Sequence, residues 1–595
     1  MDSHSSTLEI RRREMMRLVG GGLVAGGMAS LAGCSSDSGG SSSSPFRIPN
    51  TQDYNTIQGN LAAGSDYDPW IIPSLIYESY LNYNIETDEI IYNLIDEPSV
   101  DGSTLTFSIK DGRKWHNGDP VTAEDVVTQF KIAMLAGGDP QLTQNNPESL
   151  FEKINQTDKH TVEVKLSGEF NKQLAIMQIF YAGATGTASL WTPTSVYGKF
   201  VTDWDNAATD SERKSVTSEL LDFTVEYQDV VGNGLWQIEK TSGTEFTFSL
   251  FEDHPDSDNV NFDKIVMPRM NENDLVPAAR SNNVTGFQHN NPTASAVESP
   301  PSGWKALEVT GDDSGGPALI CNHQHDIYGK REVKQAFAHI VNGQGVVETL
   351  GEHIATPVPS TYTFAESLMD RYMGEPIKGN LNVYDSSEEA TSLLKSAGFS
   401  QNGNTWHRPD GKPFSPTISV FDSPPFTPVA KTIAGQLSNF GIKTDVQVVE
   451  PGNFFAQFPE GSYDLVVEWW DAGGANPYFG MDRNFVGFTG GSMQYPDEVS
   501  VPPVGNMDGK EETVNIQDML DSILTASTEP EMIQNVRKLA WVTNVTLPEI
   551  PTVMTGAVYF YNTDGWNWPK RDASVFGYDD IPAWLMEQGE LSQAN

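Results

Sequence analysis

Aromatic, acidic, amide and glycine residues follow one another in the stretch WWDAGGANPY at positions 469–478. Trp469, Trp470 and Tyr478 could offer ring faces to a ligand, Asp471 a carboxylate and Asn476 a neutral amide. Ligand pockets combine apolar walls with a few placed polar groups, so these five residues are the candidate ligand-binding set. Adjacent strand residues point to opposite faces, so at most one tryptophan is expected to face a ligand. The alternative is that both tryptophans end a core strand.

The elements that would position this stretch alternate between strand and helix. Three short apolar runs are typical of strands: 417–421, 442–449 and 463–470. Thr427 is expected to cap a helix that has Pro428 in its first turn and ends at Gly441, and a shorter helix is expected around 454–458. This β-α-β-α-β order predicts a parallel sheet with right-handed crossovers. Ligands bind beyond the carboxyl ends of such strands, where the candidate set lies.

Other segments give simpler patterns. Apolar residues alternate in LTFSIK (105–110), TVEVKL (161–166) and EFTFSL (245–250), which predicts three half-buried strands. Ser386 and Glu389 predict a capping box at the start of a helix that Gly398 ends.

Two stretches suggest catalytic or metal chemistry. GDDSGGP (311–317) is similar to the GDSGGP around a serine-protease nucleophile, but it has an extra aspartate and no histidine-containing partner motif upstream, so a glycine-rich turn is favoured. Cys321, His323 and His325 alternate and could share one strand face as metal ligands. No fourth ligand stands nearby, so a strand edge with two solvated histidines is favoured. No phosphate-binding or dinucleotide-binding glycine motif stands out, and no acid/base pair has a spacing that demands catalysis, so we expect no enzyme activity, metal or cofactor.

Charge is the strongest compositional signal. The 595 residues contain 37 Lys and Arg against 80 Asp and Glu, a net charge of −43, and the acids are spread along the whole chain. Phosphates would be repelled, which excludes nucleic-acid binding. Self-repulsion on this scale is screened in molar salt, where the Debye length is about 3 Å. The composition therefore predicts a halophilic protein.

The amino terminus predicts export and lipid anchoring. Arg12 and Arg13 open a pattern that resembles the twin-arginine signal, and a short glycine-diluted apolar stretch follows. Leu31 to Cys34 resembles a lipobox, where a lipid is attached to the cysteine and the signal is removed. Residues 1–33 are therefore the predicted signal peptide and 34–45 a Ser/Gly tether. Two acyl chains on Cys34 would suffice for stable anchoring at the extracellular face of the membrane.

The segment KDGRKWHNGDPVTAEDVVTQFKIAM (110–134) resembles the signature region of the family 5 extracellular solute-binding proteins, the dipeptide, oligopeptide and nickel receptors of ABC importers. Trp115, Gly118, Pro120 and the run TAEDV at 122–126 match that pattern in order. Further segments are similar in the family's order: IYESY (76–80), VVGNGLWQIEK (230–240), REVKQAFAHIVN (331–342), ATPVPS (355–360), EEATSLLKSAGF (388–399), QLSNFGIKTDVQVV (436–449) and LPEIPTVMTGAVYFYN (547–562). The acidic chain would be a haloarchaeal type.

The resemblance implies an α/β fold of the periplasmic-binding-protein type II-like class, in the large two-lobed form with an extra domain (cluster C) and a ligand cleft between the lobes. The expected domains are lobe I at 46–75, 195–290 and 550–595, the extra domain at 76–194, and lobe II at 291–549. It implies a monomer that captures a small molecule or peptide and delivers it to an ABC permease and ATPase complex. Two rival assignments are a surface hydrolase acting on peptides or glycosides and a surface sensor.

The sequence departs from the family where the ligand class is decided. Peptide-binding members hold the ligand's amino group with an aspartate three residues after the strand's final tryptophan, which is Gly473 here. The acid stands at Asp471 instead, so either the loop lets Asp471 take over or the ligand lacks an amino group there. A di- or oligopeptide is expected, with an oligosaccharide or another small solute as the alternative.

Overall fold

The computed structural model describes residues 44–51, 59–63, 71–84, 87, 89–136, 150–181, 188–289, 292–309, 315–364, 366–374, 377–474, 476–570, 576 and 581–594. These residues belong to one compact unit, Ser43–Asn595. Arg12, Arg13, Cys34 and nearly all of the predicted tether lie outside the described residues. Among the described helices, none is both long enough and apolar enough to cross a membrane.

The first strand of the unit joins a four-stranded sheet whose order is β1-β10-β9-β8. Its strands are β1 (Phe46–Arg47), β8 (Trp236–Thr241), β9 (Glu245–Leu250) and β10 (Lys264–Pro268). Phe246 and Phe248 alternate in β9 and are fully buried, which confirms the strand predicted there. They share a core with Phe46, Tyr559 and Trp584, so the first described strand and the carboxyl-terminal part of the chain pack on the same sheet.

A second four-stranded sheet has the order β4-β5-β7-β6 and is antiparallel throughout. Its strands are β4 (Ser99–Asp101), β5 (Thr104–Ser108), β6 (Phe151–Gln156) and β7 (Thr161–Leu166). Helices α3 (Ala123–Ala136) and α5 (Lys172–Phe180) pack on the same core. Thr122 precedes α3, and its backbone N–H and hydroxyl both donate to Asp125, at 2.9 and 3.2 Å. The signature segment therefore forms a turn and a capped helix.

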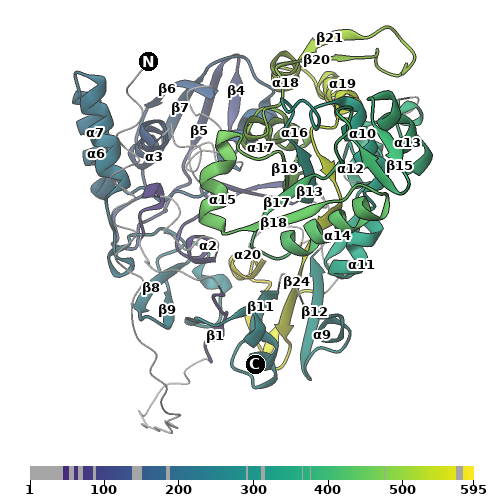
Figure 1. Cartoon of the computed structure of the whole chain (residues 1–595). Coiled ribbons are helices and arrows are strands. Elements are labelled where there is room, and N and C mark those ends of the chain that lie inside the picture. The colour runs from purple at the N-terminus through teal and green to yellow at the C-terminus, as the bar shows by residue number, and fades with distance from the viewer. Residues whose placement is uncertain are drawn as a thin grey trace. The chain divides into compact units, whose positions relative to one another are not determined.

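The five-stranded sheet β18-β17-β19-β13-β22 carries the candidate stretch. Its strands are β13 (Gly315–Cys321), β17 (Thr417–Phe421), β18 (Asp445–Val449), β19 (Leu465–Asp471) and β22 (Ile550–Pro551). β17 is parallel to both β18 and β19, which confirms the predicted β-α-β-α-β unit. β13 joins antiparallel to β19 and β22, an extension that the sequence did not predict. In Figure 1 these strands lie beside α14 (Phe426–Asn439), which contacts β13, β17, β18 and β19.

A three-stranded sheet, β11-β24-β12, is formed by β11 (Gly286–His289), β12 (Trp304–Val309) and β24 (Ala557–Asn562). β12 precedes β13 in the chain, and β23 (Val553–Thr555) links β22 to β24, so two segments connect this sheet to the five-stranded one. Other helices in this part of the chain include α10 (Arg331–Ile340), α13 (Ser387–Ser396), α15 (Pro451–Gln457), α16 (Pro477–Phe485), α17 (Phe488–Ser492), α18 (Ile516–Leu524) and α19 (Glu529–Thr546). The exact domain boundaries stay predictions.

Several local predictions were wrong. Thr427 does not cap α14, which begins at Phe426 after Pro425; its hydroxyl donates to the Phe421 carbonyl at 3.2 Å. β18 begins at Asp445 and not at 442, because the N–H groups of Ile442 and Thr444 are bound by the end of α14.

The predicted capping box forms only in part. The Ser386 hydroxyl accepts from the Glu389 N–H at 3.2 Å, as predicted. The Ser386 N–H, however, donates to His339 Nδ1 at 3.2 Å and not to the Glu389 side chain. A ring from α10 therefore takes the place that the glutamate side chain holds in a complete box.

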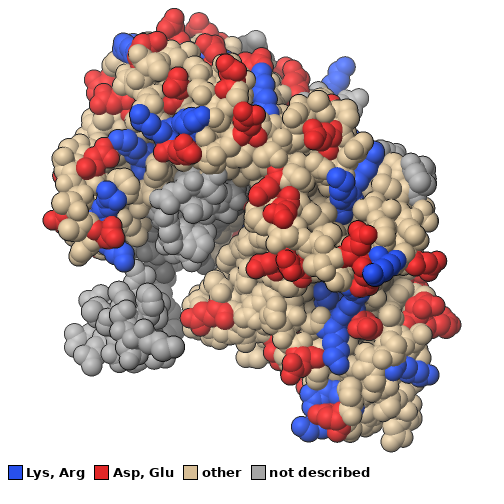
Figure 2. Space-filling view, turned by 90° about the horizontal axis from the view of Figure 1, so that it is seen from above, with Lys and Arg blue, Asp and Glu red and all other residues tan. Residues whose placement is uncertain are grey.

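Acidic side chains are spread over the surface. In Figure 2 the red Asp and Glu side chains are dispersed over the face shown, with blue Lys and Arg between them. This distribution agrees with the even spread of acids along the sequence.

Candidate ligand-binding site at the end of strand β19

Asp471 ends β19 and begins a tight loop. Its Oδ1 accepts from the Gly473 N–H at 2.7 Å, while the Asn484 side chain binds its backbone N–H and carbonyl at 3.2 and 2.8 Å. Gly473 has φ +102°, and a Cβ there would lie 2.6 Å from the Asn476 carbonyl oxygen. A side chain at position 473 would therefore clash with the loop, which explains why the family's aspartate cannot be accommodated in this conformation.

Burial shapes the acidity of the Asp471 carboxyl group, which is only half-exposed. Burial raises its pKa, while the Gly473 N–H and the Arg483 guanidinium act in the opposite direction. A positively charged ligand group beside this carboxylate would also lower its pKa, because an opposite charge favours the ionised form.

The two tryptophans occupy different environments. Trp470 is 3% exposed within the core, and its Nε1 lies 3.5 Å from the Val553 carbonyl oxygen. Trp469 is half-buried, and its ring centroid lies 6.4 Å from that of Phe426. Of the two, Trp469 has the more accessible ring in this conformation.

Asn476 and Tyr478 are both buried at the start of α16. The Asn476 side chain accepts from the Tyr478 N–H at 3.0 Å and so caps the helix. Burial raises the pKa of the Tyr478 phenol, and the side chain of Gln178, from α5, hydrogen-bonds to it. Both residues thus hold α16 in place here, which leaves Trp469 and Asp471 as the accessible members of the set. The ligand-binding role of all five residues stays a prediction.

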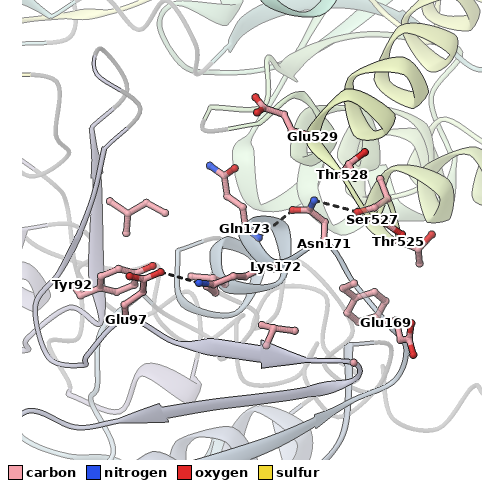
Figure 3. A pocket seen from close by; sticks show the side chains of 16 residues that line it. Tyr92, Glu97, Glu169, Asn171, Lys172, Gln173, Thr525, Ser527, Thr528 and Glu529 are labelled. Atoms are coloured by element: carbon pink, nitrogen blue, oxygen red, sulfur yellow. Dashed lines mark hydrogen bonds and ion pairs between the residues drawn. The ribbon is translucent and has the colours of Figure 1, made fainter.

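A groove with a volume of about 590 Å³ lies between two walls. Residues 90–102 and 169–176, at the second sheet and the start of α5, form one wall, and the turn from α18 to α19 forms the other. This size falls in the range of small-molecule pockets. Figure 3 shows polar side chains of both walls around it, with Lys172 reaching toward Glu97, an ion pair of 2.8 Å. The lining also includes larger, mostly apolar side chains: Ile90, Tyr92, Val100, Phe170 and Ile176.

Asn171 joins the two walls of this groove. Its backbone N–H donates to the Leu524 carbonyl at 2.7 Å, and its Nδ2 donates to the Ala526 carbonyl at 3.2 Å. Its Oδ1 accepts from the first N–H groups of α5, so the same side chain caps the helix. Sequence analysis missed this residue, although an asparagine just before an apolar helix is a recognisable capping signal.

The alternative chemistries find little support among the described residues. β13 ends at Cys321, so the expected strand edge is wrong for His323 and His325. Neither histidine is fully solvated: His323 contacts the Pro548 carbonyl and the Lys334 amine, both at 3.0 Å. In GDDSGGP, Gly316 lies in β13, where a Cβ would approach the Val553 carbonyl to 2.2 Å. Close packing against Val553 therefore requires a glycine at position 316.

One cluster outside this site has metal-ligand residue types: Glu78, His254 and Asp256. Arg113 already supplies a positive charge there, because its Nε lies 2.8 Å from a Glu78 carboxylate oxygen. Its terminal nitrogen also lies 4.0 Å from Asp256. We therefore interpret the cluster as a buried ion-pair network.

Comparison with known proteins places this geometry in a family. The family model "Bacterial extracellular solute-binding proteins, family 5 Middle" matches residues 69–492. The dipeptide-binding protein of Escherichia coli K12 is 21% identical over 445 residues, which is 70% of this chain and 73% of that protein.

Solved structures agree on the fold. An oligopeptide-binding protein of Thermotoga maritima, solved with bound mannohexaose, has a TM-score of 0.69 at 16% identity over 93% of this chain and 99% of its own. The oligopeptide-binding protein AppA of Bacillus subtilis, solved with a nonapeptide, has a TM-score of 0.66 at 14% identity over 93% and 99%. The fold is thus the two-lobed α/β, type II-like form of periplasmic binding proteins, and the chain belongs to the family 5 extracellular solute-binding proteins.

Proposed function

We propose that this protein is a membrane-tethered extracellular receptor that captures a di- or oligopeptide between its lobes and delivers it to the permease and ATPase of an ABC importer. The observation that carries the proposal is the family match across residues 69–492, which spans both the signature segment and the loop after β19. Relatives named for dipeptide binding support the peptide class.

Asp471 is the proposed contact for the peptide's ammonium group. Its carboxyl group is half-buried, and burial disfavours the ionised form. A cationic ligand group beside it would stabilise the ionised carboxylate. Trp469 offers an adjacent ring face that would pack against a side chain of the ligand.

An oligosaccharide is the second candidate ligand. The Thermotoga maritima protein of the same fold was solved with mannohexaose. The Trp469 ring would suit the flat face of a sugar, and Asp471 would then accept a hydroxyl hydrogen bond in place of an ammonium.

Anchoring and export are further parts of the proposal. Cys34 would carry lipid after cleavage behind residue 33, and Arg12 and Arg13 would direct the folded chain through the twin-arginine route. Mass spectrometry of the mature amino terminus tests this: an unmodified Cys34, or a terminus elsewhere, would remove the anchor from the account.

The test of the ligand class is a thermal-shift screen in molar KCl with free peptides, amino-blocked peptides and oligosaccharides. A bound ligand at a hundredfold excess over its Kd should stabilise the protein by about 2.7 kcal/mol. Asp471→Asn should abolish the shift by free peptides. Asp445→Asn, an exposed acid at the opposite end of the parallel strands, should leave it unchanged.

Two results would overturn the peptide assignment. Equal shifts by free and amino-blocked peptides would show that no ammonium group is recognised. A shift by oligosaccharides alone would transfer the proposal to the sugar class. Product formed from peptides or glycosides at catalytic rates would favour the rival surface hydrolase.

A further inference from the structure

Helix α5 packs on two different cores. Ile176 and Phe180 lie in the core of the second sheet. Leu174 is 1% exposed and lies instead in a core built from residues of α16, α18 and α19, among them Met481 and Leu524. The helix therefore joins the second sheet to the helices that follow β19.

Polar side chains extend this contact along the same side of α5. Asn171 binds two carbonyl groups in the turn from α18 to α19 (Figure 3). Gln178 is 3% exposed, and its side chain hydrogen-bonds to the Tyr478 phenol of α16. Asn171, Leu174 and Gln178 are three and four residues apart, so they lie on one side of the helix. We call these three residues the latch face of α5.

Helix α16, on the other side of this contact, braces the candidate ligand loop at both ends. Asn476 caps its first turn. Asn484, in its last turn, binds the backbone N–H and carbonyl of Asp471. A shift of α16 would therefore move Asp471 with it. The latch face contacts α16 and can act on the ligand loop without touching a ligand.

The chain does not connect the two sides of this contact directly. The second sheet, with the signature segment, α3 and α5, is inserted between β1 and β8 of the first sheet. We call this part the inserted unit. The five-stranded sheet and α16 follow later in the chain and are joined to the three-stranded sheet by two segments. The inserted unit thus reaches α16 through noncovalent contacts.

Polar contacts also hold the inserted unit to the first sheet. The His116 N–H donates to the Gly232 carbonyl at 2.7 Å, and its Nε2 lies 2.9 Å from the Gly234 carbonyl, just before β8. The Lys114 amine lies 2.7 Å from Asp253, which follows β9. The chain itself adds a connection at both ends of the unit. When the lobes move apart, the latch face is therefore the contact that should open.

We propose that the latch face positions the ligand loop: it holds α16, and through it Asp471, when the lobes are together, and it separates from α16 when they part. This inference deepens the proposed capture function and rests on it. A protein whose binding-competent state is only partly populated binds with an affinity reduced by that fraction. A weaker latch face should therefore reduce the affinity for peptides and for oligosaccharides by the same factor, whereas a change at Asp471 should distinguish between them.

The experiment measures distances between spin labels in the full chain, by double electron–electron resonance in molar KCl without solute. Labels are attached in pairs at three exposed positions: Lys153→Cys in β6, Lys240→Cys in β8 and Lys431→Cys in α14. Cys34→Ser removes one native thiol from all samples, and the other, Cys321, is buried.

The distance between labels 153 and 431 reports on the latch face, and the wild type should show mainly the shorter distance. Leu174→Ala should raise the ratio of longer to shorter distances about tenfold or more, because the contact loses a buried apolar side chain. Gln178→Ala, the milder variant, should raise it several-fold. Ile179→Ala is the matched control: this side chain lies in the core of the second sheet, so the distances should equal those of the wild type.

Three results would overturn the proposal. The first is a wild type without the shorter distance, and the second is the same distribution in Leu174→Ala as in the wild type. The third is a longer distance between labels 153 and 240 in Leu174→Ala, which would mean that the inserted unit leaves the first sheet.

Addition of trialanine, a free peptide, tests the proposed function separately. It should raise the fraction of the shorter distance between labels 153 and 431 in the wild type. No response to trialanine, with the difference between Leu174→Ala and Ile179→Ala intact, would count against peptide capture and would leave the latch face in place.

Discussion

Burial shifts the pKa of several ionisable residues of this protein in the direction of their neutral forms. Asp471 and Glu549 are acids whose pKa burial raises, so both favour a proton or a cation. Lys334 is the basic counterpart: it is 5% exposed, its Nζ lies 3.0 Å from His323 Nδ1, and burial lowers its pKa to about 7. At each of these positions the protein maintains an ionisable group in an environment that disfavours its charge.

Lys334→Met tests this at the residue scale. The folded-state pKa of Lys334 is below the unfolded value, so the wild type gains stability from this group as pH rises from about 7 toward 10. The variant should lack that gain and should be the more stable protein at pH 6. Urea unfolding at pH 6 and pH 9 measures the difference. An identical pH slope in both proteins would show that Lys334 keeps its charge when folded.

Gly473 and Gly474 provide a matched pair in the ligand loop. Both have positive φ, +102° and +52°, but only at Gly473 would a Cβ meet other atoms within 4 Å. Gly473→Ala should cost about 2–3 kcal/mol, from strain plus a clash, and Gly474→Ala about 1 kcal/mol. Denaturant unfolding compares them, and equal costs would argue against the tight loop.

At the scale of elements, the parallel half of the five-stranded sheet could be predicted and its antiparallel half could not. Local apolar runs, with helical patterns between them, predict strands 417–421 and 463–470. β13 and β22 come from distant parts of the chain, and no local pattern says which strand they will join. Glu468, a charged residue inside the apolar run of β19, was the local sign of a buried acid in this strand.

Asn171 links elements that are 355 residues apart in sequence, which explains why its role was not predicted. Asn171→Ala removes a helix cap and a cross-wall hydrogen bond, so it should lower stability by about 1–2 kcal/mol. If the groove walls move with the lobes, solute affinity should also change several-fold. Asn515→Ala removes only the cap of α18 and should change stability alone. Equal effects of both variants on solute binding would assign Asn171 a purely local role.

At the scale of the whole molecule, the net charge of −43 dominates. Acidic groups are dispersed over the face shown in Figure 2, so their repulsion is distributed and not confined to one patch. Many ion pairs, such as Lys172 with Glu97, are solvent-exposed and contribute little to stability.

The Tm should therefore rise steadily from low to molar KCl, because salt screens the repulsion between exposed acids. Calorimetric scans in chelator-treated samples separate screening from cation binding. NaCl and KCl should act alike, since screening depends on ionic strength. A flat Tm across this range would contradict the halophilic assignment.

The central claim is that the protein captures a solute and releases it unchanged. The direct measurement is to mix the protein with a peptide library in molar KCl, remove free solute by gel filtration, denature the protein and identify what it retained by mass spectrometry. The account predicts about one intact peptide per chain, lost in Asp471→Asn and kept in Asp445→Asn. Retention of nothing, or of cleaved fragments only, would contradict it.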